Sequence, residues 1–202
     1  MLKRFTLITF ALLLLNGCAA KRVPSIKEYY ISKAAPKFEE RVKVKKRLSS
    51  LKLIFTDSSK TAATSNIYYI KNGYRRQPYS YSRWYDTVER MFEEKLLNAI
   101  NISKISDSVA GSYSIADADL LLEISILDFV HDFSRGETSE GRVVLQATLL
   151  QSKDAKVVAS KLFEAAAPAP QPNASGGVAA LNSASDTVTK EILQWLSSVE
   201  IE

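Results

Sequence analysis

Cysteine and histidine, which serve in nucleophilic catalysis and metal binding, occur once each in the 202-residue chain, as Cys18 and His131. A zinc site needs several such ligands, so we expect no metal. A Ser-His-Asp triad would have to use His131, but no Gly-x-Ser-x-Gly motif is present. The sequence also has no phosphate-binding loop and no dinucleotide fingerprint. We therefore predict no catalytic residues, no cofactor and no enzyme, with His131 as a surface histidine in a polar loop.

The surroundings of Cys18 indicate a different chemistry for its thiol. A basic start precedes an apolar run from Phe5 to Leu15, and Gly17 comes directly before the cysteine. This order is typical of a secretory signal peptide, and the run is shorter than the about 20 apolar residues that span a bilayer. We predict that residues 1–17 are a signal peptide and that cleavage leaves Cys18 at the N-terminus.

The last four residues of this segment, Leu15-Asn16-Gly17-Cys18, resemble the lipobox of bacterial lipoproteins, with Asn16 as a departure. A thiol at that position takes a diacylglycerol, and buried acyl chains hold a protein on a membrane. We predict lipid attachment at Cys18, a lipidated tether over 18–24 and a single periplasmic domain over 25–202. Ala19 and Ala20 follow the cysteine, and by resemblance to enterobacterial sorting they favour the outer membrane. The alternatives are an ordinary signal peptide with an incidental cysteine and an uncleaved anchor.

The charge balance argues against a nucleic-acid partner. The chain has 27 basic and 22 acidic residues, and removal of Lys3 and Arg4 leaves 25 against 22. A mature net charge of about +3 is only mildly basic, whereas nucleic-acid binding relies on strongly basic surfaces. With no second cysteine there is no disulfide, so packing must supply the stability.

Hydrophobic periodicity predicts an α/β fold in which two main helices pack on a mixed sheet of five to six strands, as in an α/β/α-like sandwich. Asn72-Gly73 indicates a hairpin, and the alternation slips near residues 126–128, as at a β-bulge.

The charged segment 33–50 is either a solvated linker or edge strand, or a patch for anionic head groups. Residues 165–177 suit an extended loop. We expect strands over 26–31, 51–55, 66–71, 74–82, 117–130, 142–151 and 157–165, and helices over 84–100 and 178–196.

The segment from Tyr68 to Tyr85 holds six tyrosines and Trp84, interleaved with Lys71 and three arginines. Amphipathic rings beside cations bind nucleic acid, glycans, lipid head groups or proteins. The alternative is that half of the rings pack the hairpin onto the sheet and that Trp84 belongs to the core. The candidate partner or lipid interface consists of Tyr68, Tyr69, Tyr74, Arg75, Arg76, Tyr79, Tyr81 and Arg83.

The order of several short motifs resembles the auxiliary lipoprotein component of ABC-type transport systems, the family that accompanies MCE-domain lipid transporters. The matching segments extend over nearly the whole mature chain, although the Pro-Ala stretch at 165–172 is longer than usual. They are Glu28–Ile31, Ile67–Ile70 with Asn72–Tyr74, Tyr79–Trp84, Ala118–Leu122, and Ala179–Leu181 leading to a helix that ends near Trp195.

This resemblance implies a mixed sheet with helices packed on it and a non-catalytic role. The protein would support an MCE-domain protein with its ABC permease and ATPase in moving phospholipid between the inner and outer membranes, and it could form a homo-oligomer. Two other hypotheses remain at this point: an outer-membrane assembly lipoprotein unrelated to MCE transporters, and a periplasmic hydrolase.

Overall fold

The computed structural model describes residues 24–34, 47–56, 58–134, 136 and 138–201. Within them a mixed sheet carries two helices, which confirms the predicted fold class. The predicted signal peptide, Cys18 and most of segment 33–50 lie outside the described residues. The bulge is confirmed, because the pairing register shifts between Ile126 and Asp128.

The long strand β6 (Leu120–Asp132) organises the sheet. Along one edge it pairs antiparallel with β7 (Glu140–Gln151), which pairs antiparallel with β8 (Val157–Pro168). The other edge of β6 is shared by two strands. Its first half pairs parallel with β2 (Leu48–Phe55), and its last two residues pair parallel with β3 (Asn66–Lys71). The sheet therefore forks near the bulge.

Each branch of the fork ends in further strands. On one branch, β5 (Ser106–Ala110) pairs parallel with β2. On the other, β4 (Arg75–Trp84) forms the predicted hairpin with β3, and β1 (Lys27–Tyr29) pairs parallel with the end of β4. The sheet thus has eight strands in the described residues, more than the expected five to six.

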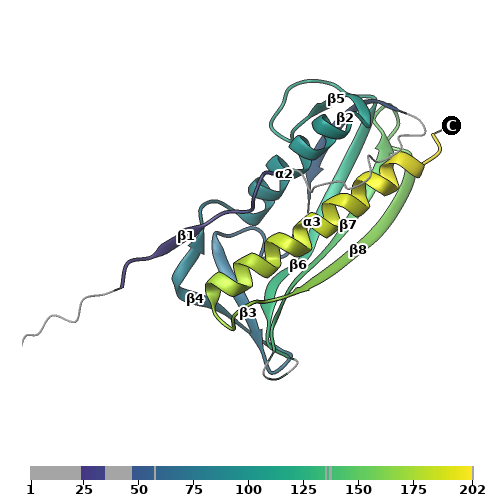
Figure 1. The fold of residues 1–202 in the computed structure, drawn as a ribbon. Coiled ribbons are helices and arrows are strands. Elements are labelled where there is room, and N and C mark those ends of the chain that lie inside the picture. The colour runs from purple at the N-terminus through teal and green to yellow at the C-terminus, as the bar shows by residue number, and fades with distance from the viewer. Residues whose placement is uncertain (1–23, 35–46, 57, 135, 137, 202) are drawn as a thin grey trace, which may run out of the picture.

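Two helices, α2 (Val88–Ser103) and α3 (Ala174–Ser198), pack side by side on one face of the sheet (Figure 1). Among the described residues the arrangement has two layers rather than the three of an α/β/α sandwich, and no described helix covers the second face of the sheet, which we call the open face. The alternation of β6 and β7 explains this, since one side chain in two is buried along most of both strands while the others are partly exposed.

Local sequence signals account for the helix ends. Thr87 caps α2 by accepting a hydrogen bond from the backbone N–H of Arg90, and Lys104 ends it in the left-handed region with φ +56°. Asn173 caps α3 in the same way through Gly176. The apolar residues of α2 recur at helical spacing and are buried, which confirms the helix predicted from periodicity; they are Val88, Met91, Phe92, Leu96 and Ala99.

Two expectations from the sequence were wrong. The strand β8 continues to Pro168 and α3 begins at Ala174, so the extended loop expected over 165–177 is only a short connection. Pro168 is tolerated because β8 is an edge strand, where a missing N–H costs no ladder bond. The strand β5 was not expected, because its polar sequence shows no apolar alternation.

Candidate functional site

The candidate interface residues lie on the hairpin of β3 and β4, whose turn is formed by Asn72 and Gly73. With Tyr74 they connect the paired residues Lys71 and Arg75, and both Asn72 and Gly73 have positive φ, 57° and 78°, which these two residue types tolerate. This confirms the hairpin prediction. The structure divides the candidate residues among three environments instead of joining them in one surface.

The first environment is an aromatic cluster that faces α3. The rings of Tyr69 and Tyr79 lie 4.8 Å apart, and the ring of Phe133 meets Tyr69 edge to face at 6.1 Å. The hydroxyl of Tyr79 lies 2.8 Å from Nδ1 of His131. Burial and the neighbouring Tyr69 raise the pKa of Tyr79, so the phenol stays protonated. These two tyrosines pack the hairpin onto the sheet, as the alternative interpretation had it.

His131 belongs to this cluster, which corrects the expectation of a surface histidine in a loop. It lies in β6 and is fully buried, with Nε2 2.9 Å from the hydroxyl of Ser139. The first turn of α3 covers it so closely that a Cβ on Gly177 would come within 2.3 Å of Nδ1. Burial lowers the pKa of His131 to about 4, while Asp132 opposes this shift, so the imidazole is neutral near pH 7.

The second environment is a charge network on the open face of the sheet. The carboxylate of Asp128 accepts from Arg76 of β4 at 2.9 and 3.2 Å and from Arg142 of β7 at 3.0 Å. Asp132 also lies 3.3 Å from Arg142. Arg76 is therefore held by the fold and is not free to bind a partner. The network thus joins β4 of the hairpin to β6 and β7.

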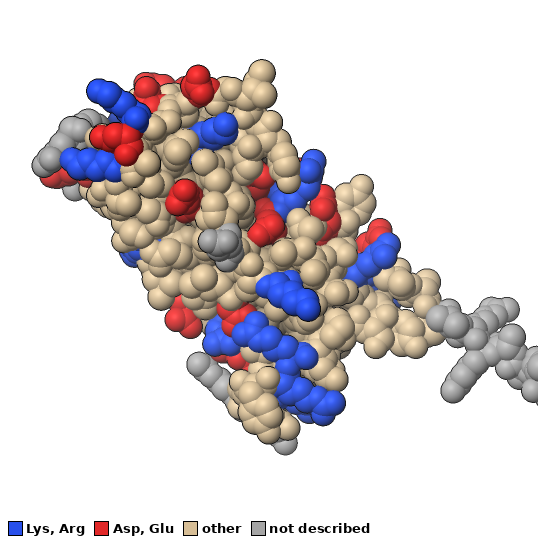
Figure 2. Space-filling view, turned by 180° about the vertical axis from the view of Figure 1, so that it is seen from behind, with Lys and Arg blue, Asp and Glu red and all other residues tan. Residues whose placement is uncertain are grey.

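The third environment is an exposed surface with two parts. At the hairpin tip, Tyr74 is 86 % exposed and Lys71 and Arg75 are also exposed. Tyr68, by contrast, is half-buried. Figure 2, seen from behind the helices, shows basic side chains gathered toward the end of the molecule where the hairpin turns. We call Lys71, Tyr74 and Arg75 the hairpin tip.

The other exposed part is the outward side of β1 and β4. The register pairs Glu28 with Arg83, and these two side chains form an ion pair. Two residues before them along the chain lie Ile26 and Tyr81, and two residues after them lie Tyr30 and Tyr85. Alternation turns all six away from Trp84, which is buried in the core as the alternative interpretation expected. The register that pairs Glu28 with Arg83, continued beyond β1, sets Ile26 beside Tyr81 and Tyr30 beside Tyr85, and we call these three pairs the ladder.

A polar clamp fixes the chain that follows β1. The fully buried ammonium of Lys95 in α2 donates to the carbonyls of Ser32 and Ala34 at 2.9 and 3.2 Å and pairs with Asp186 of α3. The side chain of Asn182 accepts from the N–H of Ser32 at 2.7 Å. We missed this clamp in the sequence. The signal was a lysine that falls on the apolar stripe of α2.

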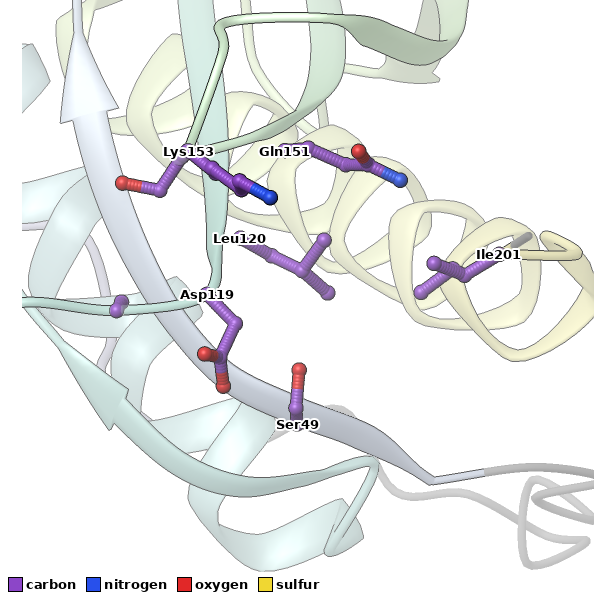
Figure 3. A pocket seen from close by; sticks show the side chains of 8 residues that line it. Ser49, Asp119, Leu120, Gln151, Lys153 and Ile201 are labelled. Atoms are coloured by element: carbon purple, nitrogen blue, oxygen red, sulfur yellow. The ribbon is translucent and has the colours of Figure 1, made fainter.

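A shallow hollow of about 390 Å³ lies at the opposite end of β6 (Figure 3). Asp119 and Lys153 line it together with Ser49. The hydroxyl of Ser50 donates to the Asp119 carboxylate at 2.7 Å, and this bond lowers the pKa of Asp119. An ionised carboxylate and a lysine that line the same hollow can bind a polar group.

Comparison with known proteins places this fold in a family. The sequence matches the ABC-type transport auxiliary lipoprotein component family over residues 41–193, three quarters of its length. The chain belongs to this family. A lipoprotein family of this kind consists of lipid-modified, membrane-anchored proteins that are associated with ABC transport systems.

Solved structures agree at the level of the fold. A crystal structure of a Xanthomonas campestris protein superimposes with a TM-score of 0.74 at 22 % identity, covering 85 % of this chain and 95 % of that one. The crystal structure of an uncharacterized protein gives 0.64 at 9 % identity, with 85 % and 99 % covered. PelC from Paraburkholderia phytofirmans is more distant, at 0.47 and 12 % identity with 75 % and 89 % covered. No curated protein matches the chain.

Neither α2 nor α3 has the length and apolar character to cross a bilayer, as judged over the described residues.

Proposed function

We propose that this lipoprotein is a non-catalytic accessory component of an MCE-type ABC system that moves phospholipid between the inner and outer membranes. Its acyl chains would be attached to Cys18, and its folded part would face the periplasm from the outer membrane. The observation that carries the proposal is the family match over residues 41–193. The sequence has no nucleotide-binding motif, so ATP hydrolysis would take place in a separate ATPase subunit.

The hairpin tip is the surface on which we expect the MCE-domain protein to dock. Its exposed tyrosine offers a rigid amphipathic ring, and its cations suit an acidic partner surface. The tip lies at the end of a hairpin that is held to the sheet by the Tyr79–His131 bond and the Arg76–Asp128 pair. A partner would therefore meet a rigid projection, and little conformational entropy would be lost on binding.

A crosslinked pull-down tests this function. The full-length protein with a C-terminal tag is crosslinked in cells, extracted with detergent and analysed by mass spectrometry. Enrichment of an MCE-domain protein with its permease and ATPase is the expected result. Recovery of a β-barrel or peptidoglycan-associated protein without these subunits would overturn the proposal in favour of an assembly factor.

Deletion of the gene provides an independent test of phospholipid transport. We expect greater sensitivity to detergent and a disturbed lipid asymmetry of the outer membrane, both restored by the wild-type gene. Cys18→Ala should fail to restore them and should release the protein from the membrane fraction. A deletion strain with unchanged detergent sensitivity and lipid asymmetry would contradict the proposal.

A further inference from the structure

The ladder on β1 and β4 has the chemistry of a surface that meets a phospholipid leaflet. Its two outer pairs are apolar or aromatic and well exposed: Ile26 is 53 %, Tyr81 49 %, Tyr30 68 % and Tyr85 73 % exposed. Tyrosine is enriched at membrane–water interfaces because its ring is apolar and its hydroxyl is hydrated. The middle pair, Glu28 with Arg83, is mutually neutralised.

The position of the ladder in the chain gives it access to the bilayer. Ile26 follows Cys18 by eight residues, which span at most about 28 Å when fully extended. A lipid on Cys18 would thus keep the first pair of the ladder within a short distance of the membrane surface. The other strongly exposed tyrosines, Tyr74 and Tyr113, follow Cys18 by more than fifty residues.

The ladder is also held rigidly against the body of the protein. The backbone N–H of Tyr85 donates to the carbonyl of Tyr29 at 2.6 Å, extending the pairing of β1 with β4. Just beyond, the clamp of Lys95 and Asn182 fastens residues 32–34 to both helices. A leaflet that touched the ladder would therefore fix the orientation of the whole protein, whereas a flexible tether alone would not.

An apolar hollow completes this surface behind the last pair. It has a volume of about 410 Å³ and is lined by Tyr30, Tyr85 and Met91, with Lys33 and Glu94 at its polar side. Lys33 and Glu94 form an ion pair at 2.8 Å, so the rim carries little net charge. Contact with lipid head groups and upper acyl chains would remove this apolar surface from water.

We propose that the ladder lies on the phospholipid leaflet into which the acyl chains of Cys18 insert, as a second membrane contact. The inference rests on the proposed lipid attachment at Cys18. The ladder acts with the anchor to set the orientation of the domain, which determines where the hairpin tip points. The contact buries the two outer pairs in the head-group region and leaves Lys27, on the opposite side of β1, in water.

Site-specific fluorescence in vesicles tests the contact. Because Cys18 is the only cysteine and its thiol is blocked once lipidated, an added cysteine is the single labelling site. Tyr30→Cys and Tyr85→Cys, purified from membranes as the full mature lipoprotein, are labelled with a polarity-sensitive dye and reconstituted into phosphatidylethanolamine–phosphatidylglycerol vesicles. We expect a blue-shifted emission at both positions and at least twofold stronger quenching by nitroxide-labelled lipid than at control positions.

Two control positions distinguish contact of the ladder with lipid from mere proximity of the dye to the membrane anchor. Lys27→Cys places the dye nearer to the anchor but on the opposite side of β1. Tyr113→Cys places it at an exposed position in the loop after β5. Equal quenching at positions 27 and 30, or no quenching at 30 and 85 in protein that floats with the vesicles, would overturn the proposal. The anchor is tested separately with the protein that carries no added cysteine: labelling of its Cys18 by the dye would refute lipid attachment there, whereas an unlabelled Cys18 with no quenching at positions 30 and 85 would overturn the ladder contact alone.

Discussion

The hydroxyl of Tyr79 and the imidazole of His131 form a 2.8 Å hydrogen bond beneath the first turn of α3. This bond joins the middle of β4, 52 residues earlier in the chain, to the central strand of the sheet. It holds a titratable group in the core, and the stability of the protein should therefore depend on pH in a defined direction.

Acid should destabilise the protein through His131. Its pKa is lowered in the folded state from 6.5 to about 4, so protons bind more tightly to the unfolded chain. Titration of His131 therefore leaves the free energy of unfolding unchanged above pH 6.5. It lowers this free energy as the pH falls from 6.5 toward 4, by about 3 kcal/mol in total. Urea unfolding at pH 7.5, 5.5 and 4.5 should show this decline.

A neutral replacement isolates the contribution of the histidine from that of the carboxylates. His131→Gln should be less stable than wild type at pH 7.5, because its fit beneath α3 is poorer, but its free energy of unfolding should fall less between pH 7.5 and 4.5. An identical pH slope in the two proteins would show that His131 does not titrate in this range.

Removal of the buried ammonium should release the chain that follows β1. Lys95→Met leaves the carbonyls of Ser32 and Ala34 and the carboxylate of Asp186 without their donor, at a cost of about 3 kcal/mol. Hydrogen exchange should rise at residues 30–34. Lys33→Met removes only an exposed ion pair and should cost less than about 0.5 kcal/mol. Equal effects of the two substitutions would argue against the clamp.

Neutralisation of Asp128 should loosen the hairpin from β6 and β7. Asp128→Asn leaves two guanidinium groups facing each other without their shared carboxylate, and we expect a loss of about 2 kcal/mol in unfolding free energy. Asp107→Asn, which breaks an exposed pair with Arg47, is the matched control and should change little. Chemical denaturation followed by tryptophan fluorescence measures both.

Truncation of the hairpin tip should weaken partner binding without affecting the fold. Tyr74→Ala with Arg75→Ala should reduce the crosslinked yield of the MCE-domain protein at least fivefold, as loss of an interface anchor does. The melting temperature should stay within about 2 °C of wild type, since both side chains are exposed. Tyr113→Ala removes a comparably exposed ring from another loop and should leave the yield unchanged; a similar reduction there would count against the tip.

The sequence alone determined the elements with strong local signals. Asn72-Gly73 specified the hairpin turn because positive φ at both positions favours these residue types. The alternation in β6 specified a half-buried strand, and its slip revealed the bulge between Ile126 and Asp128. The apolar stripe of α2 and the burial of Trp84 were also predictable, because they depend on the residue and its near neighbours.

Tertiary structure decided what depends on distant partners. His131 sits in a polar sequence, and only the packing of α3 over β6 makes it buried and neutral. The strand β5 forms because β2 offers it an edge, not because its polar residues favour a strand. The candidate interface residues form one short segment of the sequence. The sheet distributes most of them among the aromatic cluster, the charge network of Asp128, the hairpin tip and the ladder. The physical reason is that local propensity acts over a few residues, whereas burial and pairing are set by chain segments far apart.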